Sequence, residues 1–258
     1  MTDKGIPQKA LHKAHRLLQR AGFRLAPVKP PYENYMGEPF RAIYDACHPF
    51  TMTDANRMYA LYKAVNYVLA DGIEGDFVEC GVWKGGSTMV MAKALMDAGS
   101  TDRTLYLYDT FAGMSEPTDD DVAFDDGSTT HETWQASQQD GVTDWAYSPL
   151  DEVERNVRST GYAPDRFVFV KGKVEDTIPS TLPDRIALLR LDTDWKESTR
   201  HELDHLFPLV APHGVVFIDD YDWFRGAREA TDEYFAEHGI HMLLTSLGGG
   251  GVIGVKRG

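Results

Sequence analysis

The stretch DFVECGVWKGGSTMVMAKAL, residues 76–95, decides the fold. It starts as a buried strand, continues into a turn that contains glycines, and ends as an apolar helix. This order is typical of α/β folds in which the amide groups at a helix N-terminus face a ligand. The turn departs from the dinucleotide pattern G-x-G-x-x-G, because three residues separate Gly81 from the pair Gly85 and Gly86.

Apolar runs of β type recur after this stretch, separated by segments with helical spacing. We predict seven strands, at 76–80, 104–109, 167–171, 186–192, 215–219, 241–246 and 251–256. We predict helices at 8–20, within 53–72, and at 87–98, 150–160, 195–210 and 225–238. The first five strands are almost continuously apolar, as parallel strands covered on both faces are. The last two are joined by LGGGG, which is too short for a crossover helix, so they form an antiparallel hairpin. The sequence therefore predicts a Rossmann-like α/β fold with a mostly parallel seven-stranded sheet and helices on both faces.

The composition excludes several classes of protein. The 258 residues carry 26 Lys and Arg against 40 Asp and Glu, and a net charge of −14 argues against nucleic acid or an anionic membrane as the main partner. Two cysteines, Cys47 and Cys80, are too few for a disulfide framework or a thiolate zinc site. The chain lacks a run of 18 apolar residues, and its first residues lack a signal-peptide pattern, so we expect a cytoplasmic protein.

Acidic residues stand at the carboxyl ends of the first two predicted strands. A carboxylate at Glu79 can meet a cationic or hydroxyl-bearing ligand but repels a pyrophosphate. Asp109 is placed to accept hydrogen bonds from the hydroxyl groups of a ribose. An adenosine with a positive centre and no phosphate fits both residues, so we expect S-adenosylmethionine as cofactor, with Gly81, Gly85 and Ser87 of the turn as further contacts. The alternative is that the two acids only cap loops.

Three more aspartates end the fourth and fifth predicted strands. Asp192 ends the fourth strand, and the pair Asp219 and Asp220 ends GVVFIDDY. Because parallel strands joined by one crossover are usually neighbours, these carboxylates converge where ligands of open α/β sheets bind. Oxygen ligands without Cys or His nearby suit Mg²⁺, or Mn²⁺. We therefore predict a metal site at the three aspartates; the alternative is an acidic rim that holds no metal.

The order of these motifs resembles class I methyltransferases, and more narrowly the macrocin O-methyltransferase family of antibiotic-sugar enzymes. The matching stretches are GDFVECGVWKGGS, LYDTFAGMSEPTDDDV, ALLRLDTDWKESTRHELDHLFPLVAPHGVVFIDDY and REATDEYFAEHGI, from about residue 74 to 240. The resemblance implies an O-methyltransferase that uses S-adenosylmethionine and Mg²⁺ on a sugar or glycoside hydroxyl, with Asp192, Asp219 and Asp220 as metal ligands. Glu175 and Asp176 follow the third strand, and the resemblance implies that Asp176 holds the adenine; the alternative is that both are surface acids. The resemblance also implies that the chain is a homo-oligomer.

Methyl transfer to a sugar hydroxyl needs a base, because such a hydroxyl is hardly ionised at neutral pH. Asp192 is the first candidate, as base and ligand together. Lys196 is the rival, since LDTDWKE is similar to the Asp and nearby Lys of catechol O-methyltransferases, with a spacing that differs by one residue. The alternative role of Lys196 is a solvated lysine in the first turn of a helix. Asp194, followed by Glu197 three residues on, is expected to cap that helix.

We expect a helical N-terminal arm at 1–73, a methyltransferase domain at 74–258, and within it an insertion at 113–149. The insertion is either a lid over the ligands or a solvated loop that packs on the sheet. Acceptor contacts are expected from these two segments, with the candidates Tyr32, Glu33, Tyr35, Glu38, His131 and Trp134.

Three other functions compete with this interpretation. YALYK, residues 59–63, has the Tyr-x-x-x-Lys spacing of short-chain NAD(P) oxidoreductases, but it precedes the glycine turn instead of following it. A noncatalytic protein that binds S-adenosylmethionine has no need of a carboxylate trio. A metal-dependent hydrolase has no need of the methyl donor.

Overall fold

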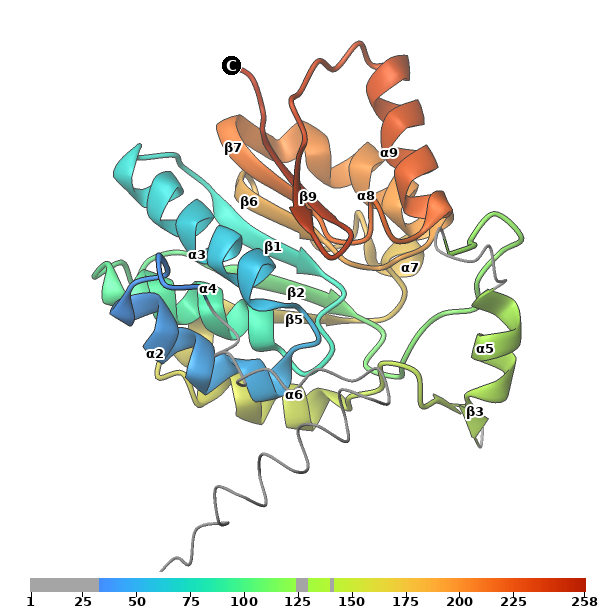
Figure 1. The fold of residues 1–258 in the computed structure, drawn as a ribbon, viewed down its shortest axis with the longest axis horizontal. Helices are drawn as coiled ribbons and strands as arrows, with labels where there is room; N and C mark the ends of the chain where they lie inside the picture. Colours follow the sequence, from blue (N-terminus) through green and yellow to red (C-terminus); the bar gives the residue numbers. More distant parts are fainter. Residues whose placement is uncertain (1–32, 124–129, 140–141) are drawn as a thin grey trace, which may run out of the picture. The chain divides into compact units, whose positions relative to one another are not determined.

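The computed structural model describes residues 33–123, 130–139 and 142–258, so the helix expected at 8–20 and Tyr32 lie outside the described residues. Residues 34–258 form one compact unit. Its centre is a seven-stranded sheet with the order β5-β2-β1-β6-β7-β9-β8 (Figure 1). The strands are β1 (Asp76–Cys80), β2 (Leu105–Asp109), β5 (Phe167–Lys171), β6 (Ile186–Leu191), β7 (Val210–Ile218), β8 (Thr245–Gly248) and β9 (Gly251–Val255).

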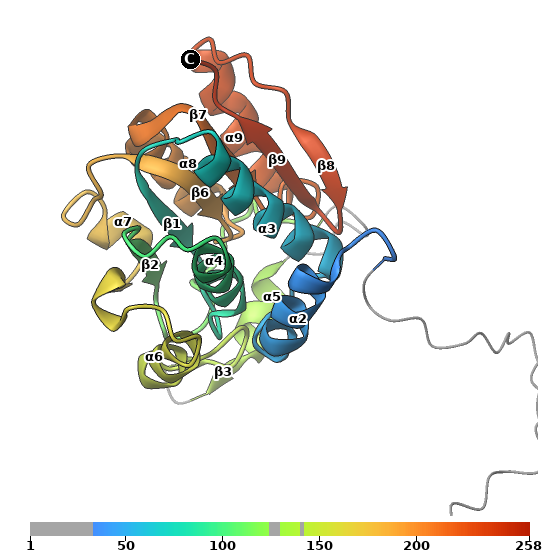
Figure 2. The same ribbon diagram turned by 90° about the vertical axis from the view of Figure 1, so that its left-hand side faces the viewer.

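The predicted fold is confirmed. Strands β5, β2, β1, β6 and β7 pair in parallel, whereas β9 is antiparallel to both β7 and β8. Helices cover both faces of the sheet: α3 and α4 lie on one face, and α8 and α9 on the other (Figures 1 and 2). The α-helices are α2 (Glu38–Cys47), α3 (Ala55–Ala70), α4 (Gly86–Asp97), α5 (Thr130–Ala136), α6 (Leu150–Arg158), α7 (Val174–Thr177), α8 (Lys196–Leu206) and α9 (Arg225–Glu237). A two-stranded sheet of β3 (Gln138–Gln139) and β4 (Val142–Thr143) lies inside the expected insertion.

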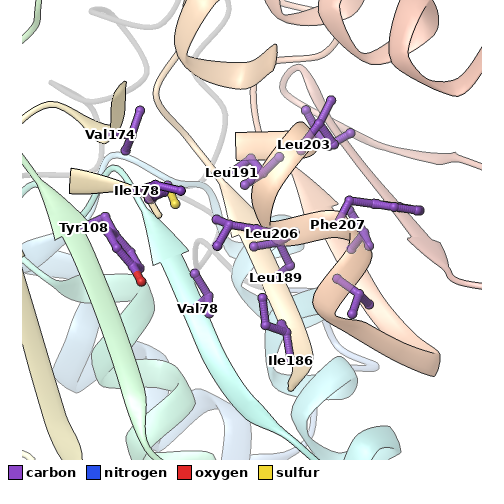
Figure 3. Packing of buried hydrophobic residues seen from close by; sticks show 14 of the residues in the cluster. Val78, Tyr108, Val174, Ile178, Ile186, Leu189, Leu191, Leu203, Leu206 and Phe207 are labelled. Carbon is purple, nitrogen blue, oxygen red and sulfur yellow. The ribbon is translucent and has the colours of Figure 1, made fainter. Parts of the chain in front are cut away.

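The core on the α8 side is built by alternate residues of the central strands. Leu189 and Leu191 of β6 pack with Leu203 and Leu206 of α8, and all four are almost completely buried (Figure 3). Each buried leucine contributes roughly 1.5–3 kcal/mol relative to an exposed one. This packing fixes the ends of β6 and α8, and so positions the loop between them.

The structure differs from the predicted elements at several places: β7 begins at Val210, which the helix predicted at 195–210 included, and α2, α5, α7, β3 and β4 were not predicted. Helix α2 begins at Glu38, and Pro39 stands in its first turn, where proline favours a helix start. Strand β8 begins at Thr245 instead of at residue 241. Its length is limited because Thr245 pairs with Ile253, and β9 extends only two residues further, to Val255.

Candidate functional site

A cavity of about 360 Å³ opens at the carboxyl ends of the parallel strands. Its lining combines predicted site residues with residues to which we assigned no role in the site. The former are Glu79, Gly81, Ser87, Asp109, Asp192, Asp219 and Asp220, and the latter include Thr53, Arg57, Glu175, Arg190, Asp194 and Trp223. The strand order explains the convergence, because β2, β1, β6 and β7 are adjacent in the sheet.

The glycine turn brings β1 against the end of β6. Gly81 has φ of +80°, and a Cβ atom there would lie 1.9 Å from the carbonyl oxygen of Asp192, so a larger residue cannot fit. Gly85 has φ of +89° and precedes α4. Ser87 is buried in the first turn of that helix and lines the cavity. Gly81 and Ser87 therefore shape one side of the cavity, whereas Gly85 is not among the lining residues, and a Cβ atom there would lie 2.7 Å from Val157 Cγ2 of α6.

Asp109 holds the glycine turn in place. Its Oδ2 accepts hydrogen bonds from the backbone N–H groups of Val82 (2.7 Å) and Trp83 (3.0 Å), and its Oδ1 accepts one from Phe111 (2.7 Å). Burial raises the pKa of this carboxyl, and the three amide hydrogen bonds oppose the rise. A carboxylate has about four acceptor positions. The Thr110 hydroxyl lies 3.5 Å from Oδ1 but only 2.7 Å from the carbonyl oxygen of Gly113, so a ribose hydroxyl can take the fourth position if Thr110 donates to Gly113.

Arg190 is the positive partner of the acidic residues. Its guanidinium is 2% exposed and donates to Glu79 Oε1 (2.9 Å) and Asp192 Oδ2 (2.7 Å), and its Nη2 lies 3.0 Å from Asp219 Oδ2. Burial raises the pKa of Glu79, and Arg190 and a hydrogen bond from Thr88 counteract this rise. The sequence did carry a signal for Arg190, since it is the one charged residue inside the apolar strand IALLRL.

Three carboxylates meet beside this arginine. One oxygen from each of Asp192, Asp194 and Asp220 lies within 4.8 Å of the other two. Within the described part of the chain, Asp220 Oδ2 is buried without a hydrogen-bond partner. Burial raises the pKa of Asp192 and Asp220 well above its usual range and that of Asp194 to about 7. A hard cation is the chemistry that such a donor set accepts.

The predicted capping role of Asp194 is wrong. The N-cap of α8 is Trp195, without a side-chain hydrogen bond, and the backbone N–H of Lys196 donates to Asp121 Oδ1 (2.8 Å). Asp194 has φ of +70°, in the left-handed region that residues with side chains seldom adopt. This backbone turns its side chain into the carboxylate cluster instead.

Asp219 and Asp220 face different partners, although they are adjacent. Asp219 Oδ2 accepts a hydrogen bond from Arg57 Nη1 (2.7 Å) and also lies beside Arg190. Neighbouring residues at a strand end point to opposite faces, so Asp219 meets α3 while Asp220 meets the start of α8. Of the metal ligands predicted by resemblance, the structure thus groups Asp192 and Asp220 but pairs Asp219 with arginines.

Besides Gly85, two predicted site residues do not line the cavity. Lys196 Nζ pairs with Glu233 Oε1 (3.0 Å) and Glu229 Oε2 (3.1 Å) of α9, and these hydrogen bonds raise its pKa. Asp176 is exposed, whereas its neighbour Glu175 is among the lining residues, because successive residues of a helical turn point about 100° apart.

The cavity mouth carries aromatic and apolar side chains. Trp223 is 50% exposed and Met52 65% exposed, and both line the cavity, as Trp145 and Phe224 do. The insertion contributes residues 113–115 and Trp145 to this lining, and the buried Asp121 anchors its first part to α8. His131, Trp134, Glu33, Tyr35 and Glu38 are not among the lining residues. None of the described helices has the length and apolar character needed to span a membrane.

Comparison with known proteins places this geometry in a family. The sequence model of the macrocin-O-methyltransferase (TylF) family matches residues 43–254. The 8-demethyl-8-(2,3-dimethoxy-alpha-L-rhamnosyl)-tetracenomycin-C 4'-O-methyltransferase of Streptomyces olivaceus is 37% identical over 78% of this chain and 74% of its own length. The mycinamicin III 3''-O-methyltransferase of Micromonospora griseorubida is 34% identical over 78% and 76%. The structure of the O-methyltransferase NovP is similar, with a TM-score of 0.70, 29% identity, and coverage of 81% of this chain and 83% of that one.

Proposed function

Because the chain belongs to the macrocin-O-methyltransferase family, we propose that it moves the methyl group of S-adenosylmethionine to a sugar hydroxyl of a glycosylated natural product. The observation that carries this proposal is the cavity in which the glycine turn meets the carboxylate cluster. The relatives are named as O-methyltransferases of a rhamnosyl tetracenomycin and of mycinamicin III. A hydroxyl on a glycoside is the acceptor class common to these names.

The charges around the cavity favour S-adenosylmethionine over a dinucleotide. The cationic lining residues are Arg57, Lys173 and Arg190, and carboxylates already pair with both arginines. A pyrophosphate would therefore add negative charge beside Glu79 and Asp109 with one lysine to compensate it. The Tyr-x-x-x-Lys segment gives the oxidoreductase alternative no support, because Tyr59 packs against Phe40 and is not among the lining residues.

The carboxylate cluster fits a divalent cation. We assign Asp192, Asp194 and Asp220 as the residues that would hold Mg²⁺, and the buried unpartnered Oδ2 of Asp220 supports this choice. An Mg²⁺ ion bound there would lower the pKa of an acceptor hydroxyl coordinated to it. Asp219 is the third ligand implied by the resemblance, but its Oδ2 atom contacts Arg57 and Arg190 instead.

The reaction requires alignment and removal of one proton. The acceptor oxygen attacks the methyl carbon, the bond from that carbon to sulfur breaks, S-adenosylhomocysteine leaves, and the hydroxyl proton passes to Asp192. With Mg²⁺ bound beside it, Asp192 would have a low pKa, so proton removal would rely on the ion lowering the pKa of the acceptor hydroxyl. Lys196 lies outside the cavity lining and holds its proton more firmly than usual, so we assign it no part in proton transfer.

The aromatic side chains at the mouth of the cavity support the proposal that the acceptor is a glycoside. Trp223, Trp145 and Phe224 offer flat apolar surfaces on which a sugar ring and its aglycone can pack. We propose that the part of the insertion at 113–115 and 145–146 closes over the acceptor. A cytoplasmic location and a homo-oligomeric state remain predictions.

Calorimetric titration of S-adenosylmethionine into the purified protein, with Mg²⁺ and with EDTA, tests the proposal. We expect micromolar binding of the methyl donor, no binding of NADPH, and Mg²⁺-dependent methylation of glycosides that Asp192→Asn abolishes. Failure to bind the methyl donor in either buffer would contradict the proposed function.

A further inference from the structure

Helix α3 reaches the end of β7 through Arg57. The side chain is 12% exposed, and its Nη1 donates to Asp219 Oδ2 at 2.7 Å across 162 residues of sequence. Asp219 is 5% exposed, and among the described residues its Oδ1 lacks a hydrogen-bond partner. Removal of the arginine would leave a buried carboxylate with only the shared guanidinium of Arg190, which already pairs with Glu79 and Asp192.

Arg57 is itself held from its other side. Asp54 is the N-cap of α3: its Oδ1 accepts hydrogen bonds from the backbone N–H groups of Asn56 (2.8 Å) and Arg57 (3.2 Å), and its Oδ2 accepts one from Arg57 Nε (2.8 Å). The same carboxylate thus starts the helix and orients the guanidinium. The planar fork of arginine makes both contacts at once, which a lysine cannot do.

The glycine run of the β8–β9 hairpin packs against Asp54 and Arg57. A Cβ atom at Gly249 would lie 2.6 Å from Asp54 Oδ2, and one at Gly251 would lie 2.9 Å from Arg57 Cδ. The carbonyl oxygen of Gly250 accepts a hydrogen bond from the N–H of Asp222 (2.8 Å), just after the aspartate pair. Three segments, α3, the end of β7 and the β8–β9 hairpin, therefore meet at Arg57.

We propose that Arg57 is a positioning residue of the carboxylate cluster, an inference that rests on the proposed function. By holding Asp219 on the α3 side, Arg57 fixes the peptide that carries the adjacent Asp220, whose carboxylate joins Asp192 and Asp194. Through Arg57, the segment that precedes the sheet becomes part of the metal-binding apparatus.

Mn²⁺ affinity of the folded protein, measured by electron paramagnetic resonance without methyl donor or acceptor, tests this proposal. We expect Arg57→Met to weaken Mn²⁺ binding by about 10–100-fold, as loss of residues that orient metal ligands does. The double variant Arg57→Met/Asp219→Asn should bind within about threefold of Asp219→Asn alone, because Arg57 acts through Asp219 and their effects do not add. Arg57→Lys, which keeps the charge without the fork, should fall between wild type and Arg57→Met.

Arg155→Met is the matched control, since Arg155 also pairs with an aspartate but is 67% exposed on α6, and it should leave Mn²⁺ affinity unchanged. Circular dichroism verifies that each variant is folded, and Arg57→Lys serves if Arg57→Met is not. Wild-type affinity in a folded Arg57→Met protein, or additive losses in the double variant, would overturn the positioning role. Absence of Mn²⁺ binding in the wild type would instead remove the metal site of the proposed function, and this inference with it.

Discussion

The carboxyl group of Glu202 accepts a hydrogen bond from the hydroxyl group of Thr193 at 2.9 Å. Thr193 lies between Asp192 and Asp194, so this contact fixes the loop that carries two members of the carboxylate cluster. Glu202 is fully buried, and within the described residues its Oε2 has no hydrogen-bond partner. Burial raises the pKa of Glu202 well above its usual range, because the buried site favours the neutral form of the carboxyl.

The effect of a substitution at Glu202 on the free energy of unfolding should therefore depend on the shape of the new side chain. Glu202→Gln keeps the shape and an acceptor for Thr193, so we expect the free energy of unfolding at pH 5 to change by less than about 1 kcal/mol. Glu202→Ala leaves a cavity and an unpaired hydroxyl, at a cost of about 3 kcal/mol. Because the folded-state pKa of Glu202 is raised, the wild type should lose stability relative to Glu202→Gln as pH rises from about 5 to 8. Urea unfolding at both pH values measures this difference, and a constant difference would contradict a buried neutral acid.

Gly81→Ala should prevent assembly of the site. The new Cβ would lie 1.9 Å from the backbone of Asp192, at a φ of +80°, so β1 and β6 must separate. Gly99→Ala is the matched control: its φ is +73°, but nothing lies within 4 Å of the new Cβ. We expect about 1 kcal/mol of destabilisation at residue 99 from backbone strain alone, and more than about 3 kcal/mol at residue 81. Equal melting temperatures for the two variants would show that the close approach is unimportant.

Asp194→Asn and Asp219→Asn separate the two sets of metal ligands. If the cation sits among Asp192, Asp194 and Asp220, loss of the Asp194 charge should weaken Mg²⁺ binding by at least about tenfold. Asp219→Asn should have a smaller effect, since its Oδ2 already accepts from Arg57. Calorimetric titration of Mg²⁺ measures the affinity of both variants. A larger loss of affinity in Asp219→Asn than in Asp194→Asn would support Asp219 as the metal ligand that the resemblance implies.

Lys196→Met should leave methyl transfer largely intact. The ammonium group pairs with glutamates of α9, and exposed ion pairs of this kind contribute at most about 1 kcal/mol to stability. We expect kcat within about tenfold of the wild type, against a loss of at least about 100-fold for Asp192→Asn, which removes the base. Initial rates with S-adenosylmethionine and a glycoside measure kcat for both variants. A loss of kcat in Lys196→Met as large as that in Asp192→Asn would reinstate Lys196 as the base.

The sheet could be predicted because its signals are local. The apolar strands, the glycine turn and the hairpin connection each lie within a few consecutive residues, and the acids at strand ends follow from strand direction. The partners of those acids were not predictable in this way. Arg57 lies on a helix that reads as an ordinary amphipathic segment, and its contact with Asp219 is a tertiary one.

Asp194 and Lys196 illustrate the limit for side-chain direction. The spacing DWKE is that of a helix cap, yet the left-handed backbone at Asp194 and the carboxylate of Asp121 replace the expected cap. A pattern of residue types does not report a φ angle, nor which helix a lysine will face. Lys196 faces α9 because two glutamates one helical turn apart attract it there.

The central position of β1 has a consequence for how the enzyme is made. Its neighbour β6 begins more than 100 residues later, and Glu79 meets Arg190 across 111 residues. Contacts of such long range form slowly, because a long loop must close before they stabilise anything. A nascent chain on the ribosome therefore carries its glycine turn without the β6 residues that complete it until β6 has been synthesised. Methyl-transfer activity during synthesis would thus report the last stage of folding, after every parallel strand has joined the sheet.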